Sequence, residues 1–521
     1  MRLRYLHLAQ YRNLKDFRVR FDVESPITAL VGKNGLGKSN LMEAIVEIFR
    51  DLDFGEPSNF KYYLRYECNG SEIEAECDPE RKSGRLSVRR LTTDGKRVRI
   101  SAAELRQERS PYLPRTVFGY YSGMSTRLEE HFRRHQKRFY DALLRGREDA
   151  HRYLFYGRLV HSQFALLAFF GYHDESTKSL LRDKLGIEGL ESVLFVMRQP
   201  SWKSLHGDPR FWLSRGVVAD FLSKLYDLAI APLRLERAVE LDFRRRETKS
   251  ELYLFLPEEE SLAALLSHYT SPAELFARLE STYINELLAE VRVRVRAAHV
   301  DGGLTFRELS EGEQQLLMVL GLLRFTSEEE SLFLLDEPDT HLNPRWGTEY
   351  IELVTSFIGA NRRSHILMSS HDPLVLSDLR KEQVLITERD ATTRVVFAHQ
   401  PDSDPRGMGV ATILRSELFD LPTTLDRGTQ RLLDAKTALM SKDTLTASDR
   451  RKLRRLNCLL DSRDFYDESV DDPEYADFLN AKARRGALYP RSRPLTSQER
   501  ENEVNVTRDI LNELDQDRTD D

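Results

Sequence analysis

A glycine-rich segment near the N-terminus has the residue types and spacing of a phosphate-binding loop. Residues 32–39, GKNGLGKS, fit the pattern G-x-x-x-x-G-K-[ST]; an apolar segment precedes them and residues with helical spacing follow. Such glycines let backbone N–H groups face phosphates, while Lys38 is expected to reach the β- and γ-phosphates and Ser39 to ligate Mg²⁺. The candidate ATP-binding residues here are Gly32, Lys33, Asn34, Gly35, Leu36, Gly37, Lys38, Ser39 and Asn40.

A carboxylate pair follows a second apolar run. Leu332–Leu335 ends in Asp336 and Glu337, and a buried strand that delivers carboxylates at its C-terminal end is typical of ligand sites in α/β sheets. We expect Asp336 to hold Mg²⁺ through water and Glu337 to orient and polarise an attacking water. The alternative is a strand that ends in a solvated acidic turn.

Two more segments carry groups suited to phosphate contact. His371 ends the apolar run in SHILMSSHDP, where it can touch a γ-phosphate, although a single histidine is more often structural. In ELSEGEQQLL (308–317), Ser310 and Glu313 have capping-box spacing, which predicts a helix N-terminus suited to an anion. An ordinary capped surface helix is the alternative.

The order of these four segments resembles that of the ABC-type ATPase superfamily. Walker A corresponds to 32–39, the signature motif to 309–313, Walker B to 332–337, the D-loop to 339–342 and the switch histidine to His371. The resemblance implies an α/β, ABC-type P-loop ATPase head in which Glu337, His371 and Lys38 are catalytic. It also implies a head-to-tail dimer, in which Ser310, Gly312 and Glu313 contact the nucleotide bound by the partner subunit.

One departure from the family pattern concerns the loop that follows Walker A. That loop normally carries a glutamine, yet VFGYYSGMSTR (117–127) contains none. We expect Tyr121, Ser122 or Arg127 to take its place.

The long interval between the motifs narrows the choice of branch. Lys38 and Ser310 are 272 positions apart, whereas a transporter's nucleotide-binding domain closes this gap in about a hundred residues, so transporter duty is disfavoured. The opening YRNLKDF (11–17) and DEPDTHLNP (336–344) resemble the RecF, SMC-like and OLD-type branch, whose members act on DNA. That opening makes Arg12 and Asn13 expected nucleotide contacts.

Within this branch the chain most resembles the PtuA family, the ATPase subunits of Septu and retron-associated anti-phage systems. The insertion lacks the heptads of a repair-type coiled coil, and no acidic motif follows a convincing core strand as in an OLD-type nuclease. The resemblance implies a separate small HNH nuclease (PtuB-like) as partner, a homodimer or higher homo-oligomer, and possible contact with DNA. The alternative is a RecF/SMC-like repair or maintenance ATPase that acts alone.

Four regions are expected along the chain. Residues 1–125 form the first part of the head with an antiparallel β subdomain, and 126–290 a large, mainly helical insertion. Residues 291–400 complete the head, and 401–521 form a charged helical extension with a partner-docking role and an acidic, frayed end.

Composition sets the remaining expectations. The 521 residues are 40% hydrophobic and 31% charged, with a net charge of −6 and three cysteines without C-x-x-C spacing. No membrane span or signal peptide is expected, and a reducing cytoplasm fits best. Since the net charge is close to neutral for this length, a DNA-binding surface has to be local. The candidates are 132–140, 242–249 and the arginines of a strand over 291–300, each with a solvated surface as the alternative.

Overall fold

The computed structural model describes most of the chain. The described residues are 1–22, 24–92, 94–107, 109–147, 152–172, 174–242, 245–298, 303–326, 330–358, 363–440, 442, 446–463, 478, 481–482, 485–487, 489 and 495–519. They fall into two compact units, Met1–Gly407 and Met408–Asp521, which are described separately below.

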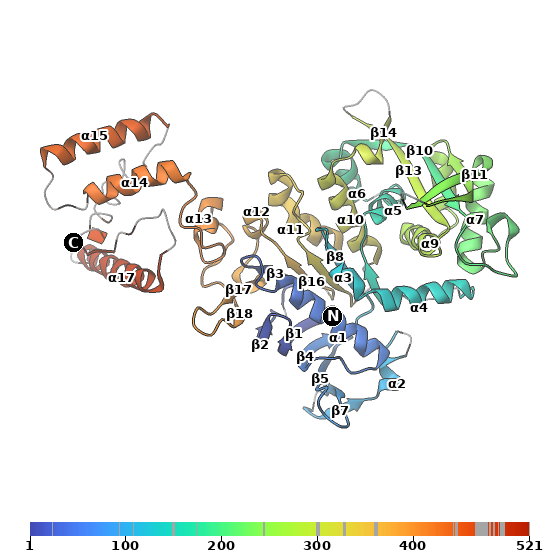
Figure 1. The fold of residues 1–521 in the computed structure, drawn as a ribbon, viewed down its shortest axis with the longest axis horizontal. Coiled ribbons are helices and arrows are strands. Elements are labelled where there is room, and N and C mark those ends of the chain that lie inside the picture. Colours follow the sequence, from blue (N-terminus) through green and yellow to red (C-terminus); the bar gives the residue numbers. More distant parts are fainter. Residues whose placement is uncertain are drawn as a thin grey trace. The chain divides into compact units, whose positions relative to one another are not determined.

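A seven-stranded, mostly parallel sheet forms the centre of the first unit (Figure 1). Its order is β18-β17-β3-β16-β15-β8-β9, and only the β17–β18 pair is antiparallel. The strands are β3 (Ile27–Val31), β8 (Val117–Tyr121), β9 (Leu154–Tyr156), β15 (Leu332–Asp336), β16 (His365–Ser369), β17 (Val384–Arg389) and β18 (Val396–His399).

The central strands of this sheet are buried along their whole length. Every residue of β3, β15 and β16 is buried, as expected for parallel strands covered on both faces, which read as unbroken apolar runs rather than alternating ones. Their register aligns Leu30, Ser369, Asp336 and Tyr121 on one line across the sheet. The segments that follow these strands therefore emerge side by side at the carboxyl edge.

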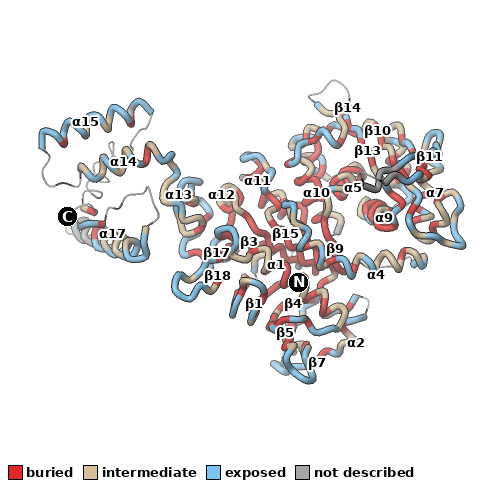
Figure 2. Tube along the Cα trace, in the orientation of Figure 1, coloured by how far each residue is buried: buried red, intermediate tan, exposed pale blue. Residues whose placement is uncertain are grey.

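A six-stranded antiparallel sheet lies beside helix α1 (Lys38–Phe54). Its order is β2-β1-β4-β5-β6-β7, with β1 (Arg2–Tyr11), β2 (Leu14–Arg20), β4 (Tyr62–Cys68), β5 (Ser71–Cys77), β6 (Leu86–Leu91) and β7 (Arg97–Ile100). One hydrophobic core joins residues of this sheet, of α1 and of the central sheet (Figure 2). Helix α1 is thus packed between the two sheets, which fixes the loop at its N-terminus.

The region between the two halves of the head is not helical alone. Its helices are α3 (Arg127–Glu130), α4 (Arg133–Leu144), α5 (Val160–Phe169), α6 (Glu175–Ser179), α7 (Gly216–Leu228), α8 (Glu259–Leu266) and α9 (Pro272–Ile284). The expectation of a mainly helical insertion omitted most of a five-stranded sheet, of which only the strand over 291–300 was expected. The order of this sheet is β11-β12-β10-β13-β14. Its strands are β10 (Ile187–Arg198), β11 (Ile230–Asp242), β12 (Arg245–Leu256), β13 (Leu288–Ala297) and β14 (Gly303–Thr305).

The head is completed by helices after this sheet. They are α10 (Glu311–Thr326), α11 (Pro344–Ile358) and α12 (Pro373–Leu376). Helix α10 packs on α5, α9 and α11, and Gly321 allows its close approach to Ala165 of α5, since a Cβ there would lie 2.2 Å from that of Ala165. The signature segment is thereby attached to the helices of the insertion.

The described residues of the second unit form helices. These are α13 (Val410–Arg415), α14 (Arg427–Met440), α15 (Ala447–Asp461) and α17 (Ser497–Thr519). The acidic end that was expected to be frayed continues in α17 as far as Thr519; a capping pair between Thr496 and Glu499 begins this helix. Most of the segment DDPEYADFL lies outside the described residues. Nowhere in the described part of the chain is a helix both long enough and apolar enough to span a membrane.

Candidate nucleotide site

The glycine-rich loop connects β3 to α1 in a conformation that requires glycine. Gly32 has φ +146°, and a Cβ at this position would lie 2.5 Å from the backbone oxygen of Thr387. Gly37 has φ +93° and caps α1, where a Cβ would lie within 2.8 Å of the Asn13 side chain. Because L-residues with side chains rarely adopt such φ values, these two glycines set the shape of the loop.

Lys38 lies inside this loop, with its side chain directed to the loop backbone. Its Nζ donates to the carbonyl oxygen of Gly32 at 2.6 Å and approaches that of Lys33 at 3.5 Å. The residue is buried, and burial lowers the pKa of its ammonium group, although Asp336 and Glu337 act in the opposite direction. A cation held among carbonyls at the start of a helix is well placed to bind phosphate.

Asp336 places its carboxylate at the end of β15. Its Oδ1 accepts a hydrogen bond from Ser369 Oγ at 2.5 Å. Burial raises the pKa of Asp336, while the hydroxyls of Ser369 and Ser39 act to lower it. A carboxylate and a hydroxyl that lie together are the hard oxygen donors that Mg²⁺ prefers, so Ser39 and Asp336 fit the ion expected from the sequence.

Glu337 and His371 face each other beside this pair. Glu337 Oε1 lies 3.4 Å from His371 Nε2, but no hydrogen bond of acceptable geometry reaches this nitrogen from the residues that the structure describes. Glu337 has a strained φ of +54° and its N–H donates to Ser369 Oγ at 3.0 Å. An unsatisfied imidazole nitrogen next to a carboxylate fits a site that receives an anionic ligand and a water.

The pKa directions favour complementary roles for these two groups. Burial, and then Asp336, raise the pKa of Glu337. Burial, and then Lys38, lower the pKa of His371. At neutral pH, His371 is therefore neutral and can donate one hydrogen bond, while Glu337 is a stronger base than an ordinary glutamate.

Of the two residues predicted near the loop, Asn13 contacts it directly and Arg12 contacts Glu43 of α1. Asn13 Nδ2 donates to the Gly35 oxygen at 3.0 Å, and Asn40 Nδ2 donates to Asn13 Oδ1 at 2.6 Å. Arg127 donates to Asn40 Oδ1 at 2.6 Å. One chain of hydrogen bonds thus joins the segment after β8 to the phosphate-binding loop, whose Lys33, Asn34 and Gly35 are exposed and Leu36 half-buried.

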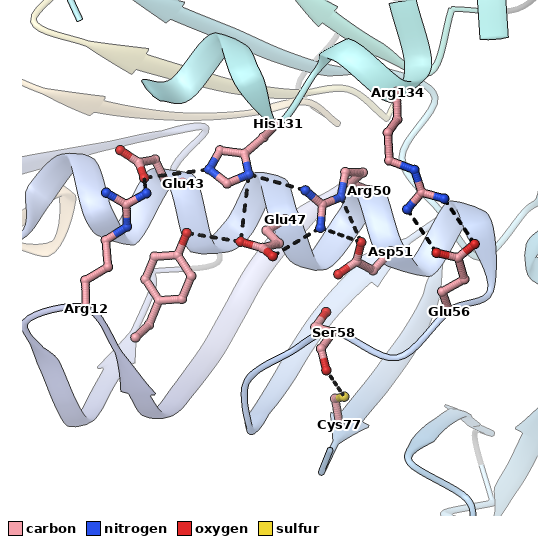
Figure 3. A network of polar contacts seen from close by, with 11 residues as sticks. Arg12, Glu43, Glu47, Arg50, Asp51, Glu56, Ser58, Cys77, His131 and Arg134 are labelled. Atoms are coloured by element: carbon pink, nitrogen blue, oxygen red, sulfur yellow. Dashed lines mark hydrogen bonds and ion pairs between the residues drawn. The ribbon is translucent and has the colours of Figure 1, made fainter. Parts of the chain in front are cut away.

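Glu43 of α1 is a residue of this region that sequence reasoning missed. Its carboxylate is 3% exposed and lies 2.6 Å from Arg12, with His131 at 3.7 Å (Figure 3). Arg127 lies 2.9 Å from the same carboxylate. Burial opposes ionisation, but His131 and the two arginines outweigh it and lower the pKa of Glu43. The sequence feature that could have identified Glu43 is its position as a charged residue inside the apolar run LMEAIV.

The residues expected to replace the missing glutamine lie between the end of β8 and the start of α3. Ser122 N donates to the Asp336 oxygen at 3.2 Å, and its hydroxyl lies 3.2 Å from that of Thr340. Burial raises the pKa of Tyr121, with Asp336 and Glu337 adding to the effect. Tyr121 and Ser122 are therefore close to the Walker B carboxylates, whereas Arg127 contacts α1.

The signature segment has the expected cap. The N–H and hydroxyl of Ser310 both donate to Glu313 Oε2, at 2.6 and 2.8 Å, and Glu313 N donates back to Ser310 Oγ at 3.3 Å. Ser310 is exposed but Gly312 is buried, and a Cβ on Gly312 would lie 2.4 Å from the His341 oxygen. Contact of these residues with a partner's nucleotide stays a prediction.

Gln315 is a second residue near the nucleotide site that was not predicted from the sequence. This buried side chain of α10 accepts from His341 N at 3.2 Å and lies 3.4 Å from the Glu337 oxygen through Nε2. It joins the signature helix to the Walker B segment within one subunit. The sequence signal was a glutamine at the start of an apolar helix face, which does not identify its partner.

The predicted basic clusters are mostly neutralised. A strand forms where one was expected over 291–300: β13 covers Leu288–Ala297, with its arginines exposed. Each of these arginines lies near a glutamate: Arg292 and Glu290 at 2.8 Å, Arg294 and Glu191 at 3.5 Å, Arg296 and Glu259 at 3.1 Å. The cluster 242–249 lies partly outside the described residues. In 132–140, Arg134 and Arg138 also lie near carboxylates, those of Glu56 at 2.9 Å and Asp53 at 2.6 Å.

Comparison with known proteins places this geometry in a family. Residues 27–377 match the family described as "AAA domain, putative AbiEii toxin, Type IV TA system". The chain belongs to this family. It is an ABC-type ATPase of the RecF/SMC/OLD branch, and the fold class expected from the sequence is confirmed.

Several relatives are similar to this chain. The OLD nuclease of Thermus scotoductus (strain ATCC 700910 / SA-01) is 21% identical over 441 residues, which cover 82% of this chain and 70% of the relative. RecF, the DNA replication and repair protein of Synechococcus sp. (strain JA-3-3Ab), is 31% identical over 108 residues, 21% of this chain and 28% of RecF. The Septu protein PtuA of Bacillus mycoides (strain KBAB4) is 23% identical over 188 residues, 34% of this chain and 26% of PtuA.

Solved SMC head domains are also similar to this chain. A head bound to the C-winged helix domain of ScpA has a TM-score of 0.34 and 12% identity, and covers 77% of this chain and 98% of its own. The head from Thermotoga maritima has a TM-score of 0.31 and 14% identity, with coverages of 77% and 99%.

Proposed function

We propose that this protein hydrolyses ATP with Mg²⁺ at the carboxyl edge of its central sheet. The observation that carries the proposal is the convergence of Lys38, Asp336, Glu337 and His371, which follow or end the neighbouring strands β3, β15 and β16. Bound Mg²⁺ supplies charge neutralisation for the transferred phosphoryl group.

Each residue of this site then has a defined role in hydrolysis. Ser39 and Asp336 hold the metal ion, and Lys38 and the loop N–H groups bind phosphate oxygens. Glu337 accepts the proton of the attacking water, and His371 donates a hydrogen bond to the γ-phosphate. These assignments extend the contacts above to the bound state.

We further propose that the active unit is a head-to-tail homodimer in the cytoplasm, in which Ser310 and Gly312 contact the nucleotide of the partner subunit. The exposed, capped N-terminus of α10 supports this, because its free N–H groups and helix dipole favour an anion. ATP binding then closes the dimer and hydrolysis opens it.

The biological role proposed here is anti-phage defence, with a separate small HNH nuclease controlled on DNA by this ATPase. The similarity to PtuA supports this role, although it spans about a quarter of PtuA. The alternative is a RecF-like maintenance ATPase that acts alone, which the RecF similarity favours. Because the OLD nuclease matches most of this chain, nuclease activity of the purified chain has to be measured too.

Affinity purification separates these roles. Tagged Glu337→Gln protein is isolated from its host with ATP and Mg²⁺, and the complex is analysed by mass spectrometry and native mass. The defence role predicts a stoichiometric small HNH protein and no DNA cleavage by the chain alone. A bare dimer with repair proteins supports the alternative, and metal-dependent cleavage by the chain alone contradicts the separate nuclease.

A further inference from the structure

Next to the far end of α1 lies a cavity of about 250 Å³ with a strongly basic lining. Five arginines line it, against one carboxylate, that of Asp53, among the described lining residues. The arginines are Arg106, Arg109, Arg115, Arg138 and Arg147. Cavities for small organic ligands are usually apolar and of about 300–1,000 Å³, so this charged cavity suits an anionic group instead.

Two buried hydroxyls in the cavity lining have unused hydrogen-bonding capacity. Ser110 is 5% exposed and Tyr153 4% exposed, and neither hydroxyl has a hydrogen-bond partner among the described residues. Buried polar groups without a partner cost free energy, and those in native proteins usually have a ligand or water to satisfy them. Two such hydroxyls beside five arginines are the donors that phosphate oxygens require.

A second hollow adjoins the cavity and extends its charge. It is lined by further basic residues of α4 and the segment after it, namely Arg134, Lys137 and Arg145, and it shares Arg138 and Arg147 with the cavity. Asp141 is its only acidic lining residue among those described. Basic side chains that extend over two adjoining hollows, rather than surrounding one point, match the repeated phosphates of a polymer.

Aromatic side chains contribute to the same surface. Phe54 lines the second hollow, and the guanidinium groups of Arg134 and Arg138 lie 4.0 and 5.1 Å from its ring centre. Phe139 lines the cavity itself. Arginines held over aromatic rings keep fixed positions and can still donate to phosphate through their edges.

We infer that these two hollows form a binding site for the phosphodiester backbone of DNA. The choice of DNA over another phosphate source rests on the function proposed above, whereas the anionic character of the ligand rests on the lining residues alone. Helix α4 (Arg133–Leu144) carries most of the second hollow, so the basic cluster 132–140 has a defined site.

The site is also connected to the nucleotide loop. Arg138 lies 2.6 Å from Asp53 and Arg134 lies 2.9 Å from Glu56, at the C-terminal end of α1 and just beyond it (Figure 3 shows Arg134 and Glu56). Lys38 begins the same helix, which has 17 residues and is thus roughly 25 Å long. A phosphate that competes with Asp53 for Arg138 acts directly on the helix that positions the loop.

Direct binding to a fluorescent 30-base-pair DNA duplex, followed over a range of salt concentrations, tests the site. The variant R106E/R109E/R147E reverses three exposed charges outside the nucleotide site. We expect binding at least about 10-fold weaker and a salt dependence shallower by about two phosphate contacts. The matched variant R292E/R294E/R296E makes the same charge change on β13, and we expect less than about 3-fold loss from it.

Tyr153→Phe gives an independent readout that a misfolded variant cannot imitate. Removal of an unsatisfied buried hydroxyl is expected to raise the unfolding temperature of the free protein, since no hydrogen bond is lost. The same change is expected to weaken DNA binding about 3-fold, because the phosphate then loses one hydrogen-bond donor. A structural role for this hydroxyl predicts the opposite sign for stability.

The outcomes separate the possible sources of phosphate. Wild-type affinity and salt dependence in the R106E/R109E/R147E variant, at an unchanged unfolding temperature, contradict the site. Stabilisation by inorganic pyrophosphate of the wild type but not of R106E/R109E/R147E, without DNA binding, contradicts DNA as the ligand. Because neither ATP turnover nor a nuclease partner is required, failure of the proposed function leaves this test intact.

Discussion

The side chain of Gln315 bridges two segments of the nucleotide site. Its Oε1 accepts from the backbone N–H of His341 at 3.2 Å, and its Nε2 lies 3.4 Å from the oxygen of Glu337. A residue of the signature helix therefore contacts the backbone just before the D-loop and within it. We predict that this side chain transmits a movement of α10 to the backbone of Glu337.

Loss of this bridge is expected to slow hydrolysis more than it weakens ATP binding. In Gln315→Ala we expect kcat to fall about 10-fold with KM within about 3-fold, because a small displacement of Glu337 affects the chemical step. Gln314→Ala is the matched control. The side chain of Gln314 is next to Gln315 in the sequence but donates to the Leu309 oxygen at 2.7 Å instead of contacting the Walker B segment. Equal losses in both variants would show that helix stability, not the bridge, is responsible.

Gly312 tests the packing between the signature helix and the D-loop. An alanine usually stabilises a helix by about 1 kcal/mol relative to glycine, but here its Cβ would lie 2.4 Å from the His341 oxygen. We expect Gly312→Ala to lower both the unfolding temperature and kcat. Gly409→Ala, which meets no atom within 4 Å, should leave both unchanged, and a stabilised, fully active Gly312→Ala would contradict the contact.

The pH dependence of hydrolysis reports on Glu337. Its pKa is raised by burial and by Asp336, so protonation inactivates the base at a higher pH than for an ordinary glutamate, and kcat falls as the pH is lowered. His371→Gln is expected to lower kcat about 10- to 100-fold but to keep this acid limb. Disappearance of the acid limb in His371→Gln would assign the titration to the histidine instead.

His365 makes the stability of the first unit sensitive to acid. Leu3 N donates to its Nδ1 at 3.1 Å and Thr28 Oγ1 lies 3.0 Å from its Nε2, and burial lowers its pKa to about 3. Below about pH 6.5 the imidazole of His365 is protonated in the unfolded chain but stays neutral in the folded chain. The free energy of unfolding therefore decreases as the pH is lowered, by roughly 1.4 kcal/mol per pH unit for this group.

The variant that isolates this effect is His365→Asn. Its unfolding temperature is expected to be lower than that of the wild type at pH 7.5 but to decrease less between pH 6.5 and 5. The exposed His206→Asn serves as the control. Parallel curves for wild type and His365→Asn would show that His365 is protonated in the folded state.

Local patterns explain why the glycine-rich loop and the buried strands around it were predictable. The loop is defined by glycines and a Lys-Ser pair within eight positions, and β3, β15 and β16 are unbroken apolar runs because both faces are buried. Asp336, Glu337 and His371 immediately follow or end such runs. The capping box of Ser310 and Glu313 is equally local.

Non-local pairing explains the omissions. Strand β10 pairs with β13 about a hundred residues later, and strand preference depends on such neighbours more than on the residues themselves. The mixture of charged and apolar residues in β11 and β12 gave a pattern that resembled helices. In the same way, the contacts of Arg127 with Asn40 and of Gln315 with His341 depend on the fold.

The central claim is that Glu337 serves as the base in a Mg²⁺-dependent ATPase. Phosphate release by the full-length chain, measured with ATP and Mg²⁺ for the wild type and Glu337→Gln, tests it most directly. We predict measurable turnover by the wild type and a loss of at least about 100-fold in the variant, which should still bind ATP and be captured as a dimer in native mass measurements. Equal turnover of the two proteins, or none by the wild type with ATP bound, would contradict it.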